Sequence, residues 1–380
     1  MRKICDLSPA IERILDAARW APSGDNAQPW RFEVRSDDDV VVCVRREVGN
    51  VYEYRDGEPT LLSAGALLEN MVVAAPTFGK RVTWRYHGSE AGEYRIQVQV
   101  TNAPNASPDP LFSRIYQRSV DRRPYRMEPL APEIKHLLAR SVDEELSVEW
   151  FETLGARWKV ATLTRMATNI RLRIPETFAI HRRIVDWDHS LSPAAIPSRA
   201  LGVDALTLKA MHWLLTDQKR TDLANRIGSP LIAGLQMDTV PGIFSSAYIA
   251  FRLRKRSCDT KERVSQLLRT GQSMQRFWLT ATKLGLVMQP CLAALAFTHY
   301  GSTGEAFTAS ERGRRLALKL AQRANRILSH PEELVFLGRI GLPNIRKAES
   351  RSTRMPLTSL VRNCVPLQVQ GAMEISDSAM

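Results

Sequence analysis

The sequence predicts an α+β protein of two unequal units, each with a mainly antiparallel sheet flanked by helices around a buried central helix. Segments 81–87 and 94–101 alternate apolar and polar residues, which is typical of strands with one buried face. Segments 61–79 and 267–285 are long and apolar, as buried helices are. Between these two series, 101–110 is rich in proline and asparagine and reads as a linker.

The first unit is assigned to residues 1–105. Apolar residues spaced three and four apart predict its first helix, and the turn formers of 21–26 end that helix. Pro76 and Gly79 are expected to end the second helix. Its expected elements are helices at 9–20 and 61–79, and strands at 30–34, 40–44, 81–87 and 94–101.

The second unit is assigned to residues 106–363, and 364–380 forms a C-terminal tail without clear periodicity. A loop rich in proline and serine is expected at 190–198. The expected elements are helices at 132–140, 157–171, 205–215, 261–285 and 306–328, and strands at 146–151, 243–251 and 334–340.

The two long apolar helices share one pattern. Leu-Leu-x-x-Gly followed by Ala-x-x-x-Gly occurs in 61–79 and again in 267–285, at a constant offset of 206 residues (267 − 61 = 206). We interpret the match as two copies of one unit, each centred on a buried helix. Coincidence between two helices rich in leucine and alanine is the alternative.

Composition narrows the class of protein. The chain has 380 residues, of which 44% are hydrophobic and 24% charged, which is ordinary for a globular protein of about two domains. It has no apolar run long enough for a membrane span, and its N-terminus lacks the apolar run of a secretory signal. The five cysteines are scattered, which favours reduced thiols in a cytoplasmic protein over a disulfide or metal framework.

The net charge of +13 is concentrated in two segments, 252–263 and 311–326. A basic surface can attract nucleic acid. However, the second segment alternates with leucines as an amphipathic helix does, and it lacks interleaved aromatic residues for base stacking. We therefore expect solvated helix faces and no nucleic-acid partner, while anionic small molecules remain a third use of the charge.

The most distinctive motif is 21–30, APSGDNAQPW. A Pro-Ser turn after a helix exposes backbone N–H groups and a hydroxyl, and Asn26 and Gln28 offer both donors and acceptors. Such a loop suits the edge of a flavin ring, which carries carbonyls and an N–H. An Asx turn with Trp30 as a core anchor is an equally good account of these residues on chemistry alone.

This motif resembles the signature of the FMN-dependent nitroreductases, and the preceding AARW strengthens the resemblance. In that family the Pro-Ser-x-x-Asn loop reaches across a homodimer interface to the partner's FMN. The resemblance therefore implies cofactor-binding roles for Pro22, Ser23, Gly24 and Asn26. Gln28 and Trp30 are expected to be structural.

A second motif, 114–125, places several arginines around a hydroxyl, which suits a phosphate group. It resembles the Arg-Arg-Ser-x-Arg phosphate motif of the same family, which implies phosphate contacts for Arg118, Ser119 and Arg122. Two departures weaken the match: Gln117 replaces an arginine, and Asp121 stands where the last cation is expected. An exposed basic turn is the alternative.

Two further segments resemble the family. In 351–357, Arg354 matches the arginine of a closing phosphate-binding segment, although Ser352 stands where a lysine is common. In 285–290, Met288 and Gln289 follow a buried helix, where the family's backbone passes the flavin near N5 and can stabilise charge on the reduced ring. A solvated basic loop and an ordinary helix-to-strand turn are the alternatives.

The two halves carry complementary motifs: the first has the Pro-Ser-x-x-Asn loop, and the second has the phosphate segments. The chain thus resembles a tandem branch of nitroreductase-like proteins in which a fused pair replaces the homodimer. This arrangement implies a pseudo-dimer within one chain and one FMN per chain, with further homodimerisation left open.

The resemblance implies an FMN-binding oxidoreductase that transfers a hydride or electron pair to or from a small organic molecule, with NAD(P)H as an electron donor. Two alternatives remain open: a non-enzymatic protein that sequesters FMN, and a flavin-dependent dehydrogenase or oxidase of a biosynthetic pathway. Zinc-protease, Walker A, Gly-x-Ser-x-Gly and Gly-x-Gly-x-x-Gly motifs are absent from the sequence, and no catalytic residue or metal ligand is assigned.

Overall fold

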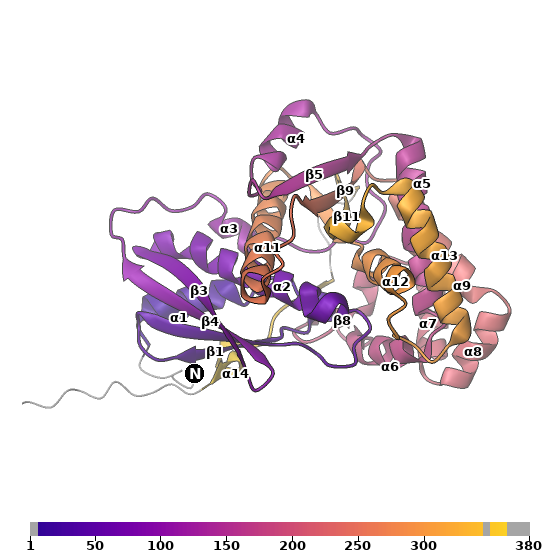
Figure 1. Ribbon diagram of the computed structural model, residues 1–380, viewed down its shortest axis with the longest axis horizontal. Helices are drawn as coiled ribbons and strands as arrows, with labels where there is room; N and C mark the ends of the chain where they lie inside the picture. The colour runs from indigo at the N-terminus through magenta and orange to yellow at the C-terminus, as the bar shows by residue number, and fades with distance from the viewer. Residues whose placement is uncertain (1–6, 345–349, 363–380) are drawn as a thin grey trace, which may run out of the picture.

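The computed structural model describes residues 7–344 and 350–362. Two sheets lie on either side of the long helices α2 and α11, and a larger group of helices covers the second sheet (Figure 1). This arrangement is a mixed α/β fold with antiparallel sheets, as the alternating segments predict.

The first sheet has the strand order β13-β1-β2-β4-β3. Its strands from the first part of the chain are antiparallel neighbours: β1 (Trp30–Val34), β2 (Asp39–Arg45), β3 (Lys80–Glu90) and β4 (Glu93–Asn102). The fifth strand, β13 (Val361–Arg362), pairs parallel to β1, with Phe32 opposite Val361. Thus the sheet that the first 102 residues begin is completed by residues near the end of the described chain.

The second sheet is fully antiparallel, with the order β10-β11-β9-β5. Its strands are β5 (Leu146–Phe151), β9 (Ala247–Leu253), β10 (Val287–Pro290) and β11 (Leu334–Gly341). The strand expected at 243–251 begins only at Ala247, because Pro241 lies in the first turn of the short helix α10 (Val240–Ile243). That part of the prediction is wrong, whereas the sheet's other predicted strands are confirmed.

Helices α2 (Tyr54–Ala74) and α11 (Thr260–Lys283) cross at two glycines. A Cβ atom on Gly65 would lie 2.1 Å from the carbonyl oxygen of Leu268, and one on Gly271 would lie 2.3 Å from that of Leu62. Leu268 and Gly271 stand 206 residues after Leu62 and Gly65, so each contact is the counterpart of the other. The two helices that share the repeated pattern therefore pack against each other.

Polar contacts between the same helices show the same reciprocal pattern. The Nε of Arg276 lies 2.5 Å from Glu69 Oε1, and the side-chain amide of Gln275 donates to Asn70 Oδ1 at 2.7 Å. Residues 275 and 276 are 206 positions after 69 and 70, so the ion pair and the amide pair occupy equivalent places. Such reciprocity is what a two-fold relation between the helices produces.

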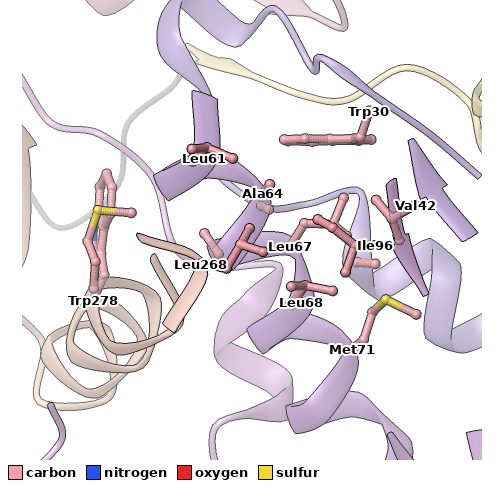
Figure 2. Packing of buried hydrophobic residues seen from close by; sticks show 14 of the residues in the cluster. Trp30, Val42, Leu61, Ala64, Leu67, Leu68, Met71, Ile96, Leu268 and Trp278 are labelled. Carbon is pink, nitrogen blue, oxygen red and sulfur yellow. The ribbon is translucent and has the colours of Figure 1, made fainter. Parts of the chain in front are cut away.

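The helix pair lies within the main hydrophobic cluster (Figure 2), where side chains from α2, the first sheet and α11 meet. The stretch Tyr54–Phe78 is long and apolar enough to cross a membrane, but 78% of its most apolar window is buried inside the protein. A core helix accounts for that apolarity. Pro76 lies in a 3-10 turn, η2 (Ala75–Phe78), and Gly79 follows at φ 66°, so both residues end the helix as expected.

The remaining helices surround this centre. They are α1 (Pro9–Ala18), α3 (Phe112–Ile115), α4 (Pro132–Ala139), α5 (Leu154–Arg171), α6 (Pro175–Ile184), α7 (Ala205–Leu215), α8 (Gln218–Arg226), α9 (Ser229–Gly234), α12 (Leu292–Thr303), α13 (Glu311–Ile327) and α14 (Leu357–Leu360). Shorter turns and strands are η1 (Gly24–Asn26), η3 (Ser198–Leu201), η4 (Leu235–Thr239), η5 (Pro331–Glu333), β6 (Val185–Asp186), β7 (Leu191–Ser192), β8 (Ile196–Pro197) and β12 (Arg351–Ser352).

Several of these elements correct the sequence-based prediction. Helices α6 and α12 were not predicted, and the loop expected at 190–198 carries β7 and β8. The last long helix begins at Glu311, not at 306, because the side chain of Ser310 caps it by accepting from the backbone N–H of Gly313. The boundary proposed near residue 105 stays a prediction, and the tail 364–380 lies outside the described residues.

The two basic segments differ in structure. In 252–263, Arg252 forms ion pairs with Glu149 and Glu333. The buried carboxylate of Glu58 forms ion pairs with both Arg256 and Arg263. In 311–326, the cations lie on the exposed face of the amphipathic α13. The first segment is therefore largely an ion-pair network, while the second is a solvated helix face.

Candidate functional site

The loop that follows α1 has an unusual backbone. Asp25, Asn26 and Gln28 have φ angles of 50°, 61° and 49°, in the left-handed region that residues with a side chain seldom adopt. Ser23 Oγ accepts from the backbone N–H of Gln28 at 3.0 Å and closes the turn. Strained backbone of this kind persists where surrounding contacts hold it, and it is common at binding sites.

The contacts that hold this loop come from distant parts of the chain. The side-chain amide of Asn26 donates to the carbonyl oxygens of Pro193, Ala195 and Thr353. Gln28 is fully buried, donates to Pro193 O and accepts from the backbone N–H of Met355. Gln28 and the buried Trp30 are structural as expected, while the buried Asn26 Oδ1 finds no hydrogen-bond partner among the described residues.

Three arginines gather beside the same loop, and we call Arg118, Arg351 and Arg354 the arginine cluster. Arg118 donates to the carbonyl oxygen of Trp20 at 3.1 Å, and Arg354 donates to that of Ala21 at 3.0 Å. Arg351 donates to Tyr116 O and lies over the Trp20 ring, 5.1 Å from its centroid. Carbonyls just beyond the C-terminal end of α1 thus hold two of the three guanidiniums.

The cluster carries uncompensated positive charge. Burial and the neighbouring Arg354 and Arg351 hold the pKa of Arg118 well below its usual range. Burial, with Arg351 and Arg19, lowers the pKa of Arg354 to about 9. Among the described residues, no carboxylate lies within ion-pairing distance of any cluster arginine, although Arg19 itself pairs with Asp16.

These features fit a bound phosphate. A guanidinium has five N–H donors, and each cluster arginine uses only some of them in hydrogen bonds to carbonyl oxygens. The Nε of Arg118 is buried without a partner in the part of the chain that the structure describes. Buried cations without a counter-ion are costly, and a phosphate would supply both the missing charge and the missing acceptors. The residues present therefore fit the phosphate of an FMN molecule.

The strand after α11 also reaches this region. Val120 forms a parallel bridge with Met288, and the backbone N–H of Asp121 donates to Met288 O at 3.2 Å. The Met288 side chain is fully buried, and Gln289 Oε1 accepts from Arg339. The Ser119 hydroxyl makes only a 3.5 Å contact with Val120 O.

Arg122 occupies a different place from Arg118. It donates to Ala200 O at 3.1 Å, and the charges that act on it are those of Asp25, Arg171 and Arg339, not those of the arginine cluster. Burial lowers the pKa of Arg122, and the same effect raises that of Asp25. The structure therefore brings Arg118 and Arg354 together but places Arg122 with the strained loop.

Sequence reasoning missed several residues of this region. Arg351 lies within the 351–357 motif, and Arg19 lies within the AARW segment, but neither was singled out. Arg171, at the end of α5, had no local signal at all. An excess of arginine over acidic residues near the recognised motifs was the one clue available to find the first two.

Two cavities lie elsewhere. One of about 270 Å³ is beside the first sheet, lined by residues that include Arg35, His87 and Arg95. The other, of about 640 Å³, lies between the segments 144–145 and 254–258. Neither contains a residue of the loop or of the arginine cluster. Since the arginine cluster and the unpartnered Asn26 Oδ1 and Arg118 Nε lie at the loop, we place the candidate site there.

The fold and the site define an α+β protein in which a strained loop lies beside a cluster of buried and half-buried arginines. Residues 9–48, which include α1, the loop and the first two strands, match the Nitroreductase family model. This segment is therefore similar to the nitroreductases. Among curated proteins, none matches the chain.

Solved structures of nitroreductases also match. The Nitroreductase-like family protein from Bacillus cereus is 12% identical, covering 68% of this chain and 97% of its own, with a TM-score of 0.34. The FMN-dependent nitroreductase NfnB from Mycobacterium smegmatis, solved in complex with NADPH, is 15% identical, covering 66% of this chain and 96% of its own, with a TM-score of 0.35.

Proposed function

We propose that this protein is an FMN-binding oxidoreductase of the nitroreductase type, which moves a hydride or electron pair to or from a small organic molecule. The observation that carries the proposal is the arginine cluster: three buried or half-buried cations that pair with no carboxylate of the described residues, beside a strained loop that resembles a flavin-binding signature.

Different residues would bind the phosphate and the ring of FMN. Arg118 and Arg354, with Arg351 and the hydroxyl of Ser119, would bind the phosphate. The loop of Pro22, Ser23, Gly24 and Asn26 would border the isoalloxazine ring, with the orphaned Asn26 Oδ1 as an acceptor. The backbone of Met288 and Gln289, in β10, would lie along the flavin ring. Arg122 lies apart from the arginine cluster, and its charge acts on Asp25 of the loop.

The bound flavin would supply two-electron redox chemistry, with NAD(P)H as its donor. The protein's part is to position the cofactor and its partner molecule and to surround them with fixed charges. The strained loop is held by amide contacts to segments 193–195 and 353–355, so its geometry is set before any ligand arrives.

We further propose the tandem arrangement, in which two unequal units imitate a homodimer. The reciprocal contacts of α2 and α11 support it, as does the pairing of β13 with β1. The loop belongs to the first unit, and the cluster arginines belong to the second. Only one such combination exists in the chain, so we propose one FMN per chain.

A flavin store is the second candidate. A protein that binds FMN tightly and shields it from reductants would use the same arginine cluster and the same loop. The two functions are separated by anaerobic mixing of the flavin-loaded protein with NADH and with NADPH. Bleaching of the flavin band supports the reductase, whereas a stable yellow protein supports storage or an oxidase. Absence of flavin binding at saturating FMN would overturn both.

A further inference from the structure

The helical region from α7 to α9 leaves an unusual number of apolar side chains in contact with water. Of the sixteen large apolar side chains that are exposed among the described residues, nine lie between 206 and 244, about a tenth of the chain. Single exposed apolar residues are ordinary, whereas a group of them marks an interaction surface. We call the following six residues the apolar surface: Leu206, Trp213, Leu223, Ile227, Leu231 and Ile232.

The apolar surface is one region of the molecule. It comes from three successive helices, of which α7 packs on α8 and α8 on α9. Leu206 and Trp213 stand seven residues apart on α7 and therefore share a face of that helix, as do Leu223 and Ile227, four residues apart at the end of α8. Figure 1 shows the three helices together, on the opposite side of the molecule from the first sheet.

These helices are anchored to the protein, so the exposure is not that of a loose segment. The carbonyl oxygen of Asn225 in α8 accepts from Arg173 at 2.8 Å, and the Asn225 side chain donates to the carbonyl oxygen of Leu172 at 2.8 Å. The rings of Trp187 and His212 stack with centroids 4.5 Å apart and fix α7. Even so, α7 and α8, which the structure describes in full, contain no buried residue.

Cations stand among the apolar side chains. Within α7 and α8 the one acidic residue is Asp222, and the four cations are Lys209, Lys219, Arg220 and Arg226. Among the described residues, none of the four forms an ion pair with a carboxylate. The Arg220 guanidinium lies over the Trp213 ring, 4.9 Å from its centroid. The region therefore combines aliphatic side chains, an exposed indole and unpaired positive charge.

An anionic lipid surface fits this combination better than a second copy of the chain does. Two chains of net charge +13 repel each other, and a two-fold axis would place the four cations against their own equivalents. Lysine and leucine are also uncommon among the residues that stabilise protein interfaces. At a bilayer, in contrast, lysine and arginine extend their charged ends to lipid phosphates, while their stems and the apolar side chains enter the acyl boundary.

We propose that α7–α9 dock this protein on the surface of an anionic bilayer, with the apolar surface inserted and the four cations at the headgroups. The helices have 11, 9 and 6 residues. Each is far shorter than the roughly 20 residues that cross a bilayer, so the docking is peripheral and does not require a membrane span. The inference does not depend on bound flavin.

Flotation of the full-length protein with lipid vesicles tests the docking. The wild type should bind vesicles of phosphatidylcholine with about 30% phosphatidylserine, and should bind pure phosphatidylcholine at least roughly tenfold more weakly. Leu206→Gln combined with Ile227→Gln should weaken binding to the mixed vesicles by at least roughly tenfold, because two apolar side chains no longer insert. Val48→Gln is the matched control, since Val48 is as exposed as Ile227 but lies between β2 and α2, and it should bind as the wild type does.

A second variant tests the charge. Lys219→Gln combined with Arg226→Gln should weaken binding to the mixed vesicles by roughly tenfold and leave binding to pure phosphatidylcholine within about twofold. Thermal melting verifies that each variant is folded. If the apolar double variant does not fold, the cation variant, which alters no apolar contact, decides the question. Equal binding of the cation variant and the wild type to the mixed vesicles would overturn the inference.

Other outcomes would assign the surface to something else. Absence of flotation by the wild type would overturn the inference. Equal flotation of the wild type and the folded apolar double variant would also overturn it, because net charge alone would then attract the lipid. Light scattering measures the oligomeric state of the same proteins. A wild-type dimer that binds no vesicles, and that the apolar double variant converts to a monomer, would assign the surface to a second copy of the chain.

Discussion

Gly65 and Gly271 lie face to face where α2 crosses α11, and neither position has room for a side chain: a Cβ on Gly65 would lie 2.8 Å from the Cα of Gly271. Backbone therefore packs on backbone at the centre of the molecule. The close approach joins a helix from the first part of the sequence to one that lies about two hundred residues later.

The first prediction concerns this crossing. Gly65→Ala places a methyl group 2.1 Å from a backbone oxygen, so the helices must separate, and we expect a loss of roughly 1–3 kcal/mol in the free energy of unfolding. Gly271→Ala should lose a similar amount. Urea unfolding measures both. The control is Gly155→Ala in α5, where a Cβ meets nothing within 4 Å and stability should not fall.

The double variant sharpens the same experiment. Since both methyl groups force apart one contact, the double variant should lose less than the sum of the single losses. Additive losses would show that the two glycines do not share a contact in solution.

The second prediction concerns the phosphate. Arg118→Gln or Arg354→Gln should each weaken FMN affinity by roughly 1.5–3 kcal/mol, the worth of a hydrogen bond to a charged group. Fluorescence titration of FMN into the apoprotein measures the effect, and Arg312→Gln on the exposed face of α13 is the control. The melting temperature of the apoprotein should not fall, because removing one charge relieves repulsion within the cluster. A lower melting temperature with unchanged FMN affinity would mean that these arginines serve only to cap α1.

The third prediction concerns stoichiometry. A homodimeric nitroreductase has two equivalent sites, whereas here the loop comes from one part of the chain and the cluster from the other. We expect one FMN released per chain on denaturation after saturation with FMN. A ratio near two would show that an equivalent phosphate site exists without Arg118, Arg351 and Arg354, and would contradict the tandem proposal.

The fourth prediction concerns pH. Burial, together with the charge of Arg171, lowers the pKa of His181 to about 3, whereas a histidine in the unfolded chain titrates near 6.5. Between these values the unfolded chain binds a proton that the folded chain does not, so stability falls as the pH falls. The slope from this one group is at most about 1.4 kcal/mol per pH unit.

Urea unfolding at pH 7 and at pH 5 measures the effect. His181→Gln should lose less stability over this interval than the wild type does. His87→Gln, which changes an exposed histidine on β3, should lose as much as the wild type. An identical pH dependence in all three proteins would show that folding does not lower the pKa of His181.

Local sequence patterns predicted much of the fold. Alternation predicted the strands around Val82 and Val98, and the apolar segments 61–79 and 267–285 predicted two long buried helices, which the structure contains. The motifs also drew attention to Arg118 and Arg354, which do lie in one cluster. These features are readable because they depend on residues a few positions apart or on a repeated pattern.

Only the tertiary structure decided the rest. Arg351 joins the cluster because β12 runs beside β7, which brings it against Trp20. Arg122, grouped by the motif with Arg118, instead donates to the carbonyl oxygen of Ala200. No local sequence pattern predicts that these residues lie close together. The sequence by itself determined most of the long helices and the sheet strands. How segments more than a hundred residues apart approach one another determined which side chains share a site, because the direction of a side chain depends on the packing of its whole element.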